Sequence, residues 1–302
     1  MGSPEVLDVH GLHNVFLNFG EVLRAHAPRL DALNVFPVPD ADTGRNMADT
    51  IAAALAVVDA TGTVARLCET FGEGAFFGAK GNSGTILAQL LSGFLAVLAE
   101  EQTPISAWAV SAALQRAAHV GPAAVLEVAP GTMLTVAADV AAAAMAATAT
   151  VSVSLTDLLD ACQHAGYRSL AKTVEQNPVL ARARVVDSGA AGYLLLLDSF
   201  LFVAAQRPLP ESLIEETVEP DSEHKEAGEP DWEVMFTLIG SRSQREVITA
   251  LAAVGDSVVV TGSVGAWTCH VHADDIGAVL EAVLDLGRPR RIRVESLRMV
   301  DG

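Results

Sequence analysis

Residues 33–47 read LNVFPVPDADTGRNM, which sets two aspartates, Asp40 and Asp42, on a turn stiffened by prolines. Pro37 and Pro39 fix φ on the approach to the aspartates. Gly44 then allows the chain to turn tightly into the helix that the following residues predict. Two carboxylates placed side by side repel each other, so this turn requires an explanation.

Two interpretations of the turn stay open from the residues alone. In the first, Asp42 or Thr43 caps the helix that follows. In the second, Asp40 and Asp42 hold Mg²⁺, which prefers hard oxygen ligands and would leave coordination positions for phosphate oxygens. The amides that begin the helix would then bind phosphate directly. Those amides belong to Gly44, Arg45 and Asn46.

Three further loops run into apolar helices in a similar way. Residues 78–91 read GAKGNSGTILAQLL, residues 129–137 read APGTMLTVA, and residues 185–197 read VVDSGAAGYLLLL. Each loop alone is more typical of a helix cap or a close helix contact than of an anion site. In a bundle with alternating helix directions, however, several helix N-termini lie at one end. Four such termini around a metal ion would suit a nucleotide triphosphate.

The pattern is helical nearly throughout residues 1–206. Leu12, Val15, Phe16, Phe19 and Leu23 recur at spacings that bury one face of a helix. Alanine-rich residues 136–149 and aliphatic residues 86–100 continue the helical signal. Because alanine lets helices approach closely, this part of the chain predicts a compact multi-helix bundle.

The composition changes at residues 207–231, which are rich in proline and glutamate and predict an exposed linker. From residue 232 to 302 the pattern alternates between strands and helices. Strands are expected at 234–240, 257–263, 267–273 and 291–299, and helices at 243–255 and 275–287. The order β-α-β-β-α-β predicts a ferredoxin-like α+β domain.

Composition excludes several classes of protein. The 302 residues include 37 acidic and 19 basic residues, a net charge of −18, which argues against nucleic acid and anionic lipid surfaces as partners. Three cysteines without a paired spacing and an N-terminus without a signal-peptide pattern predict a cytoplasmic protein. The apolar run at 192–205 is short and contains Asp198, so we expect no membrane insertion.

The four loops, in this order, resemble the nucleotide-binding domain of the dihydroxyacetone kinase superfamily (the DhaL or DAK2 type). The likeness covers roughly residues 8–205 and is greatest to the ATP-binding subunit of bacterial fatty-acid kinase, although the further domain of that subunit is not seen here. It extends more weakly to residues 254–262 and 269–287. The resemblance implies an antiparallel helical barrel that holds ATP and Mg²⁺ at one rim.

The resemblance also assigns roles to residues of this chain. Asp40 and Asp42 would hold Mg²⁺, with Asn34 as a further ligand, and Ala41 stands where fatty-acid kinases usually have glycine. The residues around the phosphates and the nucleotide would be Thr43, Gly44, Arg45, Asn46, Asn82, Ser83, Gly84, Gly131, Thr132, Met133, Asp187, Ser188 and Gly189.

His270 and His272 are two residues apart on an expected strand, so both point to one face, and Cys269 points to the other. Two such histidines could begin a zinc site, or they could be satisfied imidazoles on a solvent-facing strand. The related kinases pair a similar His-Val-His with a cysteine of the first strand. Glu233 stands at that place here, so the resemblance implies a Zn²⁺ site of His270, His272 and Glu233.

These observations predict an ATP- and Mg²⁺-dependent kinase subunit. By resemblance, the acceptor would be a fatty acid presented by a DegV-like carrier protein. Two alternatives stay open: a protein of the dihydroxyacetone (glycerone) kinase type, and a non-catalytic protein that senses nucleotides. The oligomeric state is also open, with a homodimer among the alternatives.

Overall fold

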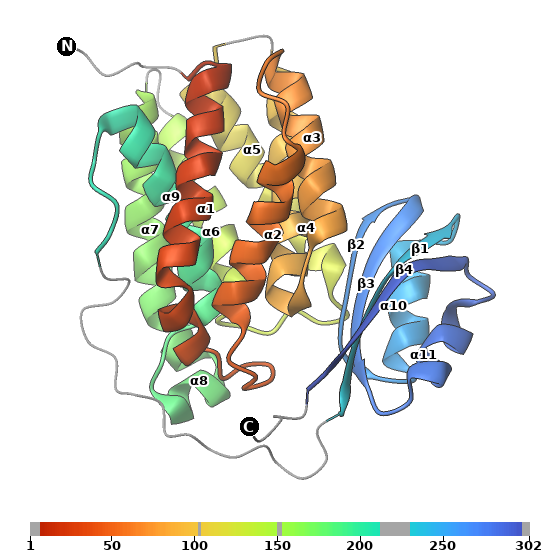
Figure 1. Ribbon diagram of the computed structural model, residues 1–302. Coiled ribbons are helices and arrows are strands. Elements are labelled where there is room, and N and C mark those ends of the chain that lie inside the picture. Colours follow the sequence, from red (N-terminus) through yellow and green to blue (C-terminus); the bar gives the residue numbers. More distant parts are fainter. Residues whose placement is uncertain (1–6, 102–103, 150–152, 212–229, 298–302) are drawn as a thin grey trace.

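The computed structural model describes residues 7–101, 104–149, 153–211 and 230–297, and it divides into a helical part and a mixed α/β part (Figure 1). The helices of the first part are α1 (Val9–Ala32), α2 (Thr43–Val57), α3 (Val64–Gly78), α4 (Gly81–Leu98), α5 (Ala107–Val120), the 3₁₀ helix η1 (Gly121–Ala124), α6 (Met133–Thr148), α7 (Leu155–Gln176), α8 (Pro178–Ala183) and α9 (Ser188–Ala205).

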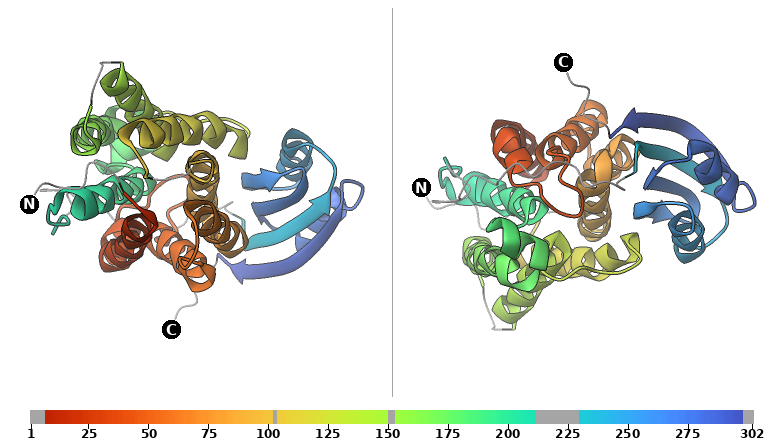
Figure 2. Two further views of the ribbon diagram at one scale, coloured as in Figure 1. Left: turned by 90° about the horizontal axis from the view of Figure 1, so that it is seen from above. Right: turned by 90° about the horizontal axis from the view of Figure 1, so that it is seen from below.

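The long helices form a closed antiparallel ring. Each packs against the next along the chain from α1 to α7, and α9 packs against both α7 and α1 (Figure 2). The stripe predicted for the first helix is confirmed, because Leu12, Val15, Phe16, Phe19 and Leu23 are all buried. The ring therefore encloses one apolar core, and the predicted helical barrel is confirmed.

Within the described residues, two helices, α4 and α9, are long and apolar enough to cross a membrane. In the fold, however, 67% of the α4 window and 83% of the α9 window are buried inside the protein. Helix α9 is apolar on nearly every side because it packs against α1, α2, α6 and α7 at once. Asp198 is accommodated in α9 by a hydrogen bond of 2.7 Å from the hydroxyl of Tyr167. These are core helices of the bundle.

The second part contains β1 (Trp232–Gly240), α10 (Gln244–Ala252), β2 (Asp256–Ser263), β3 (Gly265–Ala273), α11 (Ile276–Val283) and β4 (Arg288–Ser296). Its four strands pair antiparallel in the order β2-β3-β1-β4. This is the predicted β-α-β-β-α-β arrangement, and it places β4 at one edge of the sheet. The predicted linker lies largely outside the described residues.

The sheet packs one face on α10 and α11 and turns the other face toward the helical bundle (Figures 1 and 2). The bundle-facing side contacts α4 and η1 through β2 and β3. Polar contacts also join the two parts: the hydroxyl of Thr268 donates to the carbonyl of Phe76 (3.2 Å), and Nη2 of Arg293 donates to the carbonyl of Ala79 (3.2 Å). Residues of β1, β3 and β4 are thereby brought against the starts of α2 and α4.

Candidate functional site

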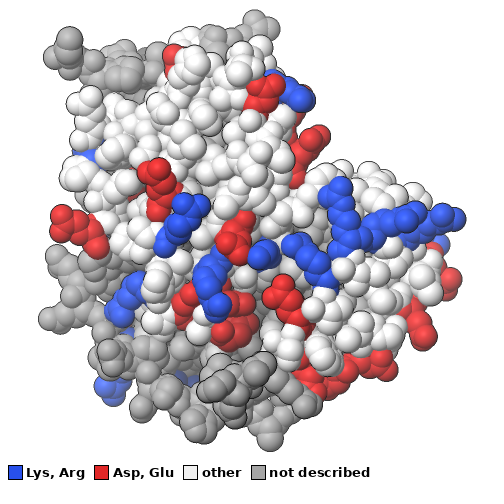
Figure 3. All heavy atoms as spheres, viewed as in Figure 1, with Lys and Arg blue, Asp and Glu red and all other residues white. Residues whose placement is uncertain are grey.

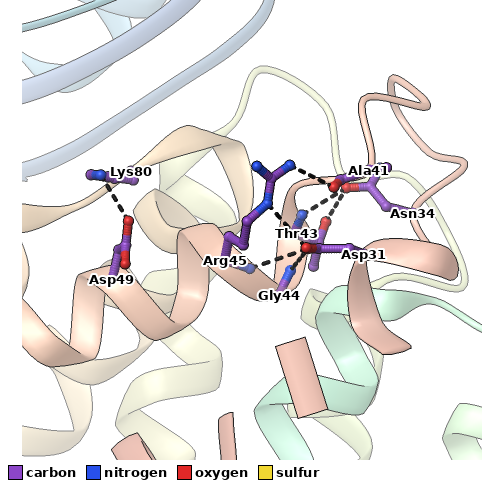
Figure 4. Close-up of polar contacts among 8 residues, drawn as sticks. All are labelled: Asp31, Asn34, Ala41, Thr43, Gly44, Arg45, Asp49 and Lys80. Atoms are coloured by element: carbon purple, nitrogen blue, oxygen red, sulfur yellow. Dashed lines mark hydrogen bonds and ion pairs between the residues drawn. The ribbon is translucent and has the colours of Figure 1, made fainter. Parts of the chain in front are cut away.

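Helix α2 is capped by residues that precede the aspartate turn, and Asp42 and Thr43 do not cap it. Asp42 occupies the N-cap position, but its side chain makes no capping hydrogen bond. Asp31, in α1, accepts from the amides of Gly44 (2.7 Å) and Arg45 (3.1 Å). Asn34 accepts from the amide of Thr43 (3.0 Å) and also from its hydroxyl (Figure 4). The capping interpretation of Asp42 or Thr43 is therefore wrong.

This arrangement changes the expected roles of three residues. The amides of Gly44 and Arg45, expected to face phosphate, already donate to Asp31. The guanidinium of Arg45 also pairs with Asp31 (3.1 Å) and donates to the carbonyl of Ala41 (2.8 Å; Figure 4). The amide oxygen of Asn34, expected to bind metal, accepts from Thr43 instead. In this structure Gly44, Arg45 and Asn34 hold the turn in place.

Gly44 has a packing reason of its own. A Cβ atom at this position would lie 2.3 Å from the carbonyl oxygen of Ala27, so only glycine lets α2 approach α1 this closely. Gly84 is similar, because its Cβ would lie 2.2 Å from the hydroxyl oxygen of Thr50. The two glycines bring α2 close to the end of α1 and to the start of α4.

The start of α4 supplies two side chains to the same place as the aspartates. Asn82 and Ser83 line a small cavity together with Asp40 and Asp42. The hydroxyls of Ser83 and Thr43 lie 3.0 Å apart. Oδ1 of Asn82 is buried and has no hydrogen-bond partner among the described residues, so this oxygen can accept from a donor or bind a cation.

The two remaining glycine-containing loops pair with each other. The carboxylate of Asp187 accepts from the amide of Ala190 (2.7 Å), and it also accepts from the amide of Met133, so it joins the starts of α9 and α6. Burial raises the pKa of Asp187 to about 7. Gly189 lies against Met133, whose Cε would be 2.9 Å from a Cβ atom there.

The other expected residues of these loops are Gly131, whose φ is +67°, Thr132, whose hydroxyl donates to the carbonyl of Ala129 (2.9 Å), and buried Ser188. None of these residues lines the aspartate cavity. A neighbouring contact still places α9 beside α2, since Gly192 lies against the side chain of Met47. The four helix starts thus share one end of the bundle, in two adjacent groups.

The residues expected to bind zinc lie in the aspartate cavity. Glu233 of β1 and His270 and His272 of β3 all line it, opposite Asp40 and Asp42. Both imidazoles are buried, with exposed fractions of 0% and 2%, so the interpretation of a solvent-facing strand is wrong. Cys269 is buried in the apolar core on the opposite face of the sheet, as predicted. Sequence reasoning missed this juxtaposition because nothing local indicates how the two parts dock.

The geometry of these three residues fits a cation. One ligand atom of each of Glu233, His270 and His272 can be chosen so that all lie within 4.8 Å of one another. Nδ1 of His270 lies 3.1 Å from the carbonyl oxygen of Ser257, which only accepts, so Nδ1 carries a proton. Nε2 of His270 then faces Oε1 of Glu233 at 2.9 Å. That contact requires a proton or a metal ion between the two atoms.

The pKa values of the carboxyl groups that line the cavity also favour a bound cation. Burial, with the nearby charges of Asp42 and Glu233, raises the pKa of Asp40 to about 8. Burial also raises the pKa of Asp42. For Glu233, burial opposes ionisation, but the hydrogen bond and charge of His270 hold its pKa below the usual value. Three carboxyl groups around one small cavity are a setting in which a divalent cation replaces protons.

The cavity itself is small, about 20 Å³. That volume accommodates one water molecule or one ion, because a single water-sized sphere needs about 10–15 Å³. In this arrangement the sheet of the second part closes over the carboxylates. A cation fits between the two parts as they stand, whereas a triphosphate requires the sheet to move away from the turn.

Comparison with known proteins assigns both parts of the chain. The model of the DAK2 domain matches residues 37–202, and the model of the FakA-like middle domain, named after fatty acid kinase, matches residues 229–301. The chain is 31% identical to protein YloV of Bacillus subtilis over 314 residues, and this match covers 98% of the chain and 56% of YloV.

An uncharacterized protein of Staphylococcus epidermidis is 32% identical over 294 residues, with 91% of this chain and 52% of that protein covered. The chain thus spans about half the length of these curated relatives. The crystal structure of the dihydroxyacetone kinase of C. freundii aligns with 65% of this chain and 34% of that one, at 19% identity and a TM-score of 0.45. By the two family models, the chain belongs to the DAK2 domain family of kinase subunits and carries a FakA-like middle domain after its DAK2 domain.

Proposed function

We propose that this chain is the nucleotide-binding part of a phosphotransferase, in which Asp40 and Asp42 hold Mg²⁺ bound to the phosphates of ATP. The observation that carries the proposal is the position of these two carboxylates. They face each other, half-buried, in a small cavity, and capping of α2 is done by Asp31 and Asn34 instead. Asp42 also hydrogen-bonds to the side chain of Asn46. Two carboxylates this close are costly to ionise together unless a cation neutralises them.

Asn82, Ser83 and Thr43 supply the remaining polar groups beside the aspartates. The buried Oδ1 of Asn82 has no partner among the described residues, so it fits a metal ligand or a ligand to metal-bound water. The hydroxyl of Ser83 is a donor that suits phosphate oxygens, whereas the hydroxyl of Thr43 already donates to Asn34. Phosphoryl transfer depends mainly on positioning and charge neutralisation, so such a set can act without a strong general base.

We further propose that Glu233, His270 and His272 bind Zn²⁺ beside the Mg²⁺ position. Two imidazole nitrogens and one carboxylate are a ligand set that zinc accepts, and the hydrogen bond from His270 to Ser257 fixes the ring orientation as a second coordination shell would. Such an ion would attach β1 and β3 next to the aspartate turn. It would thereby set how far the sheet lies from the nucleotide site.

A separate proposal concerns the phosphoryl acceptor. The middle-domain family carries fatty acid kinase in its name, so we propose a fatty acid, presented by a DegV-like carrier protein, as the acceptor. The alternatives are a protein of the dihydroxyacetone kinase type and a non-catalytic nucleotide sensor. The cysteines described are free and buried, which fits the cytoplasmic setting proposed for this activity.

Binding of a nonhydrolysable ATP analogue with Mg²⁺, measured by titration calorimetry, tests the nucleotide site. Asp42→Asn keeps the shape of the side chain and removes its charge, so we expect at least a tenfold loss of Mg²⁺-dependent affinity. Asp49→Asn is the matched control, because Asp49 lies on the same helix but is exposed and pairs with Lys80 (2.8 Å; Figure 4). Equal affinity of Asp42→Asn and the wild type would reject the site.

Two further measurements test the acceptor and the zinc site separately. Labelled ATP with Mg²⁺, oleate and a carrier protein should give labelled acyl phosphate. Labelled dihydroxyacetone phosphate in a parallel assay with dihydroxyacetone, or binding without transfer to any acceptor, would favour the alternatives. Metal analysis of the purified protein should find one zinc ion per chain, and His272→Ala should lose it. Protein without zinc would remove the zinc site from the proposal and leave the magnesium site untouched.

A further inference from the structure

A second cavity lies on the bundle-facing side of the sheet, beneath the edge strand β4. Its volume is about 300 Å³, within the size range of small-molecule sites and far larger than the aspartate cavity. Phe77, Met235 and Ile292 line it with apolar atoms, and Thr237 and Thr268 add hydroxyl groups. Phe236 and two guanidinium groups, from Arg291 and Arg293, complete the lining.

The chain's strong negative charge makes these arginines unusual. The net charge is −18, yet β4 carries four arginines, at positions 288, 290, 291 and 293. Figure 3 shows basic side chains gathered over this edge of the sheet, with white and acidic surface around them. Charged residues, a proline and a bulge on an edge strand ordinarily prevent strands of other molecules from pairing with it. That role explains Arg288 and Arg290, which are exposed, and Pro289, which is half-buried.

Arg291 and Arg293 are exposed as well, but their side chains line the chamber. The pairing of β1 with β4 shifts between Met235 and Thr237, so that β4 bulges there. Arg291 lies in this bulge with a left-handed φ of +53°, and its guanidinium lies 4.4 Å from the ring centroid of Phe77. A strained bulge that re-aims a side chain is a common feature of ligand sites.

Arg293 is held by a hydrogen bond to the helical bundle. It lies opposite Met235 on the bundle-facing side of the sheet, and its Nη2 donates to the carbonyl of Ala79. Among the described residues, neither Arg291 nor Arg293 has a carboxylate oxygen within 4.0 Å. The charge of Arg293 does help to lower the pKa of Glu233, with which it lines a neighbouring narrow cavity. Two positive charges at a largely apolar chamber, neither of them in a close ion pair, favour an anion that brings its own charge.

We infer that this chamber binds an organic anion, with a carboxylate or phosphate head group held by Arg291 and Arg293 and an aliphatic body against Phe77, Met235 and Ile292. The guanidinium fork matches either head group, because both present two oxygens in one plane. The apolar lining contributes in proportion to the aliphatic surface that it covers. The inference does not depend on the proposed kinase activity, since no residue of the aspartate cavity lines the chamber.

The chamber nevertheless adjoins the carboxylate cluster. A narrow cavity of about 10 Å³ lies between them and is lined by Lys80 and Glu233. It shares Met235 and Arg293 with the chamber, and it shares Glu233 and Asn46 with the aspartate cavity. A ligand in the chamber would therefore lie next to the nucleotide site along the junction of the two parts.

Titration calorimetry on the full chain, without nucleotide or metal, tests the inference with four probes. Octanoate and octyl phosphate carry both a head group and an aliphatic body, octanol lacks the charge, and inorganic phosphate lacks the body. We expect saturable binding of at least one octyl anion, and the one that binds more tightly identifies the head group. Octanol and inorganic phosphate should bind at least tenfold more weakly.

Variants locate the binding. Arg291→Gln should weaken the octyl anion at least tenfold, and Phe77→Ala should weaken it severalfold, while circular dichroism confirms that both fold. Arg288→Gln is the control on the same strand, because Arg288 is exposed and does not line the chamber. The inference would be overturned if neither octyl anion shows saturable binding. It would also be overturned if Arg291→Gln and the wild type bind the octyl anion with equal affinity.

Discussion

Mg²⁺ binding at Asp40 and Asp42 should release a proton, and the amount should depend on pH in a defined way. The pKa of Asp40 is raised to about 8 by burial and by the charge of Asp42. At pH 7 such a group is about nine-tenths protonated, so binding of the cation should release about 0.9 proton; at pH 9 it should release about 0.1.

The same competition sets the affinity for Mg²⁺. With a pKa of about 8, the apparent affinity should rise roughly tenfold between pH 7 and pH 9, since protons no longer compete for the carboxylate. Titration calorimetry in two buffers of different ionisation enthalpy measures the proton release at each pH. Asp40→Asn should remove most of it, and Asp49→Asn should leave it unchanged.

In the absence of metal, the free energy of unfolding should fall as pH rises, whereas the affinity for Mg²⁺ should rise. Because the pKa of Asp40 is higher in the folded state than the usual 3.8, its contribution favours folding at low pH and is lost as pH rises through about 8. Saturating Mg²⁺ should restore that stability above pH 8. Normal Mg²⁺ binding with no proton release, and with an affinity that does not change between pH 7 and pH 9, would show that the ion does not displace a proton from Asp40.

The remaining predictions concern the turn itself. Asn34→Ala removes both acceptor contacts to Thr43 and should lower the free energy of unfolding by about 1–3 kcal/mol, measured by urea denaturation. Gly44→Ala places a Cβ atom 2.3 Å from the carbonyl of Ala27 and should cost about 1–3 kcal/mol or more; an unchanged melting temperature would contradict this contact. Ala41 has a φ of +52°, so Ala41→Gly should be neutral or stabilising by up to about 1 kcal/mol, with Mg²⁺ affinity retained.

Much of the fold is predictable because its signals are local. The buried stripe of α1 follows from apolar residues at helical spacing, and the change of period after residue 232 predicts the elements of the second part in their order. The opposite faces of Cys269 and His270 follow from strand alternation alone. These features need no knowledge of what packs against what.

The site was only partly predictable, because its decisive contacts join distant segments. Asp31 lies in the last turn of α1, where nothing marks it as the cap of the next helix. The burial of His270 and His272 depends on how the sheet docks on the bundle, which no local pattern indicates. Arg291 is turned toward the chamber by a bulge whose register is set by β1. In each case tertiary packing determines the role of a residue whose sequence neighbours suggest another.

A diffraction experiment can locate the metal ion: a crystal grown with Mn²⁺ in place of Mg²⁺ and a nonhydrolysable ATP analogue, measured at a wavelength that gives an anomalous manganese signal. We expect a manganese peak in contact with the carboxylates of Asp40 and Asp42, with phosphate oxygens completing its coordination and the sheet displaced from the turn. Bound nucleotide whose manganese and phosphates lie elsewhere, with both carboxylates still facing each other across the closed cavity, would contradict it.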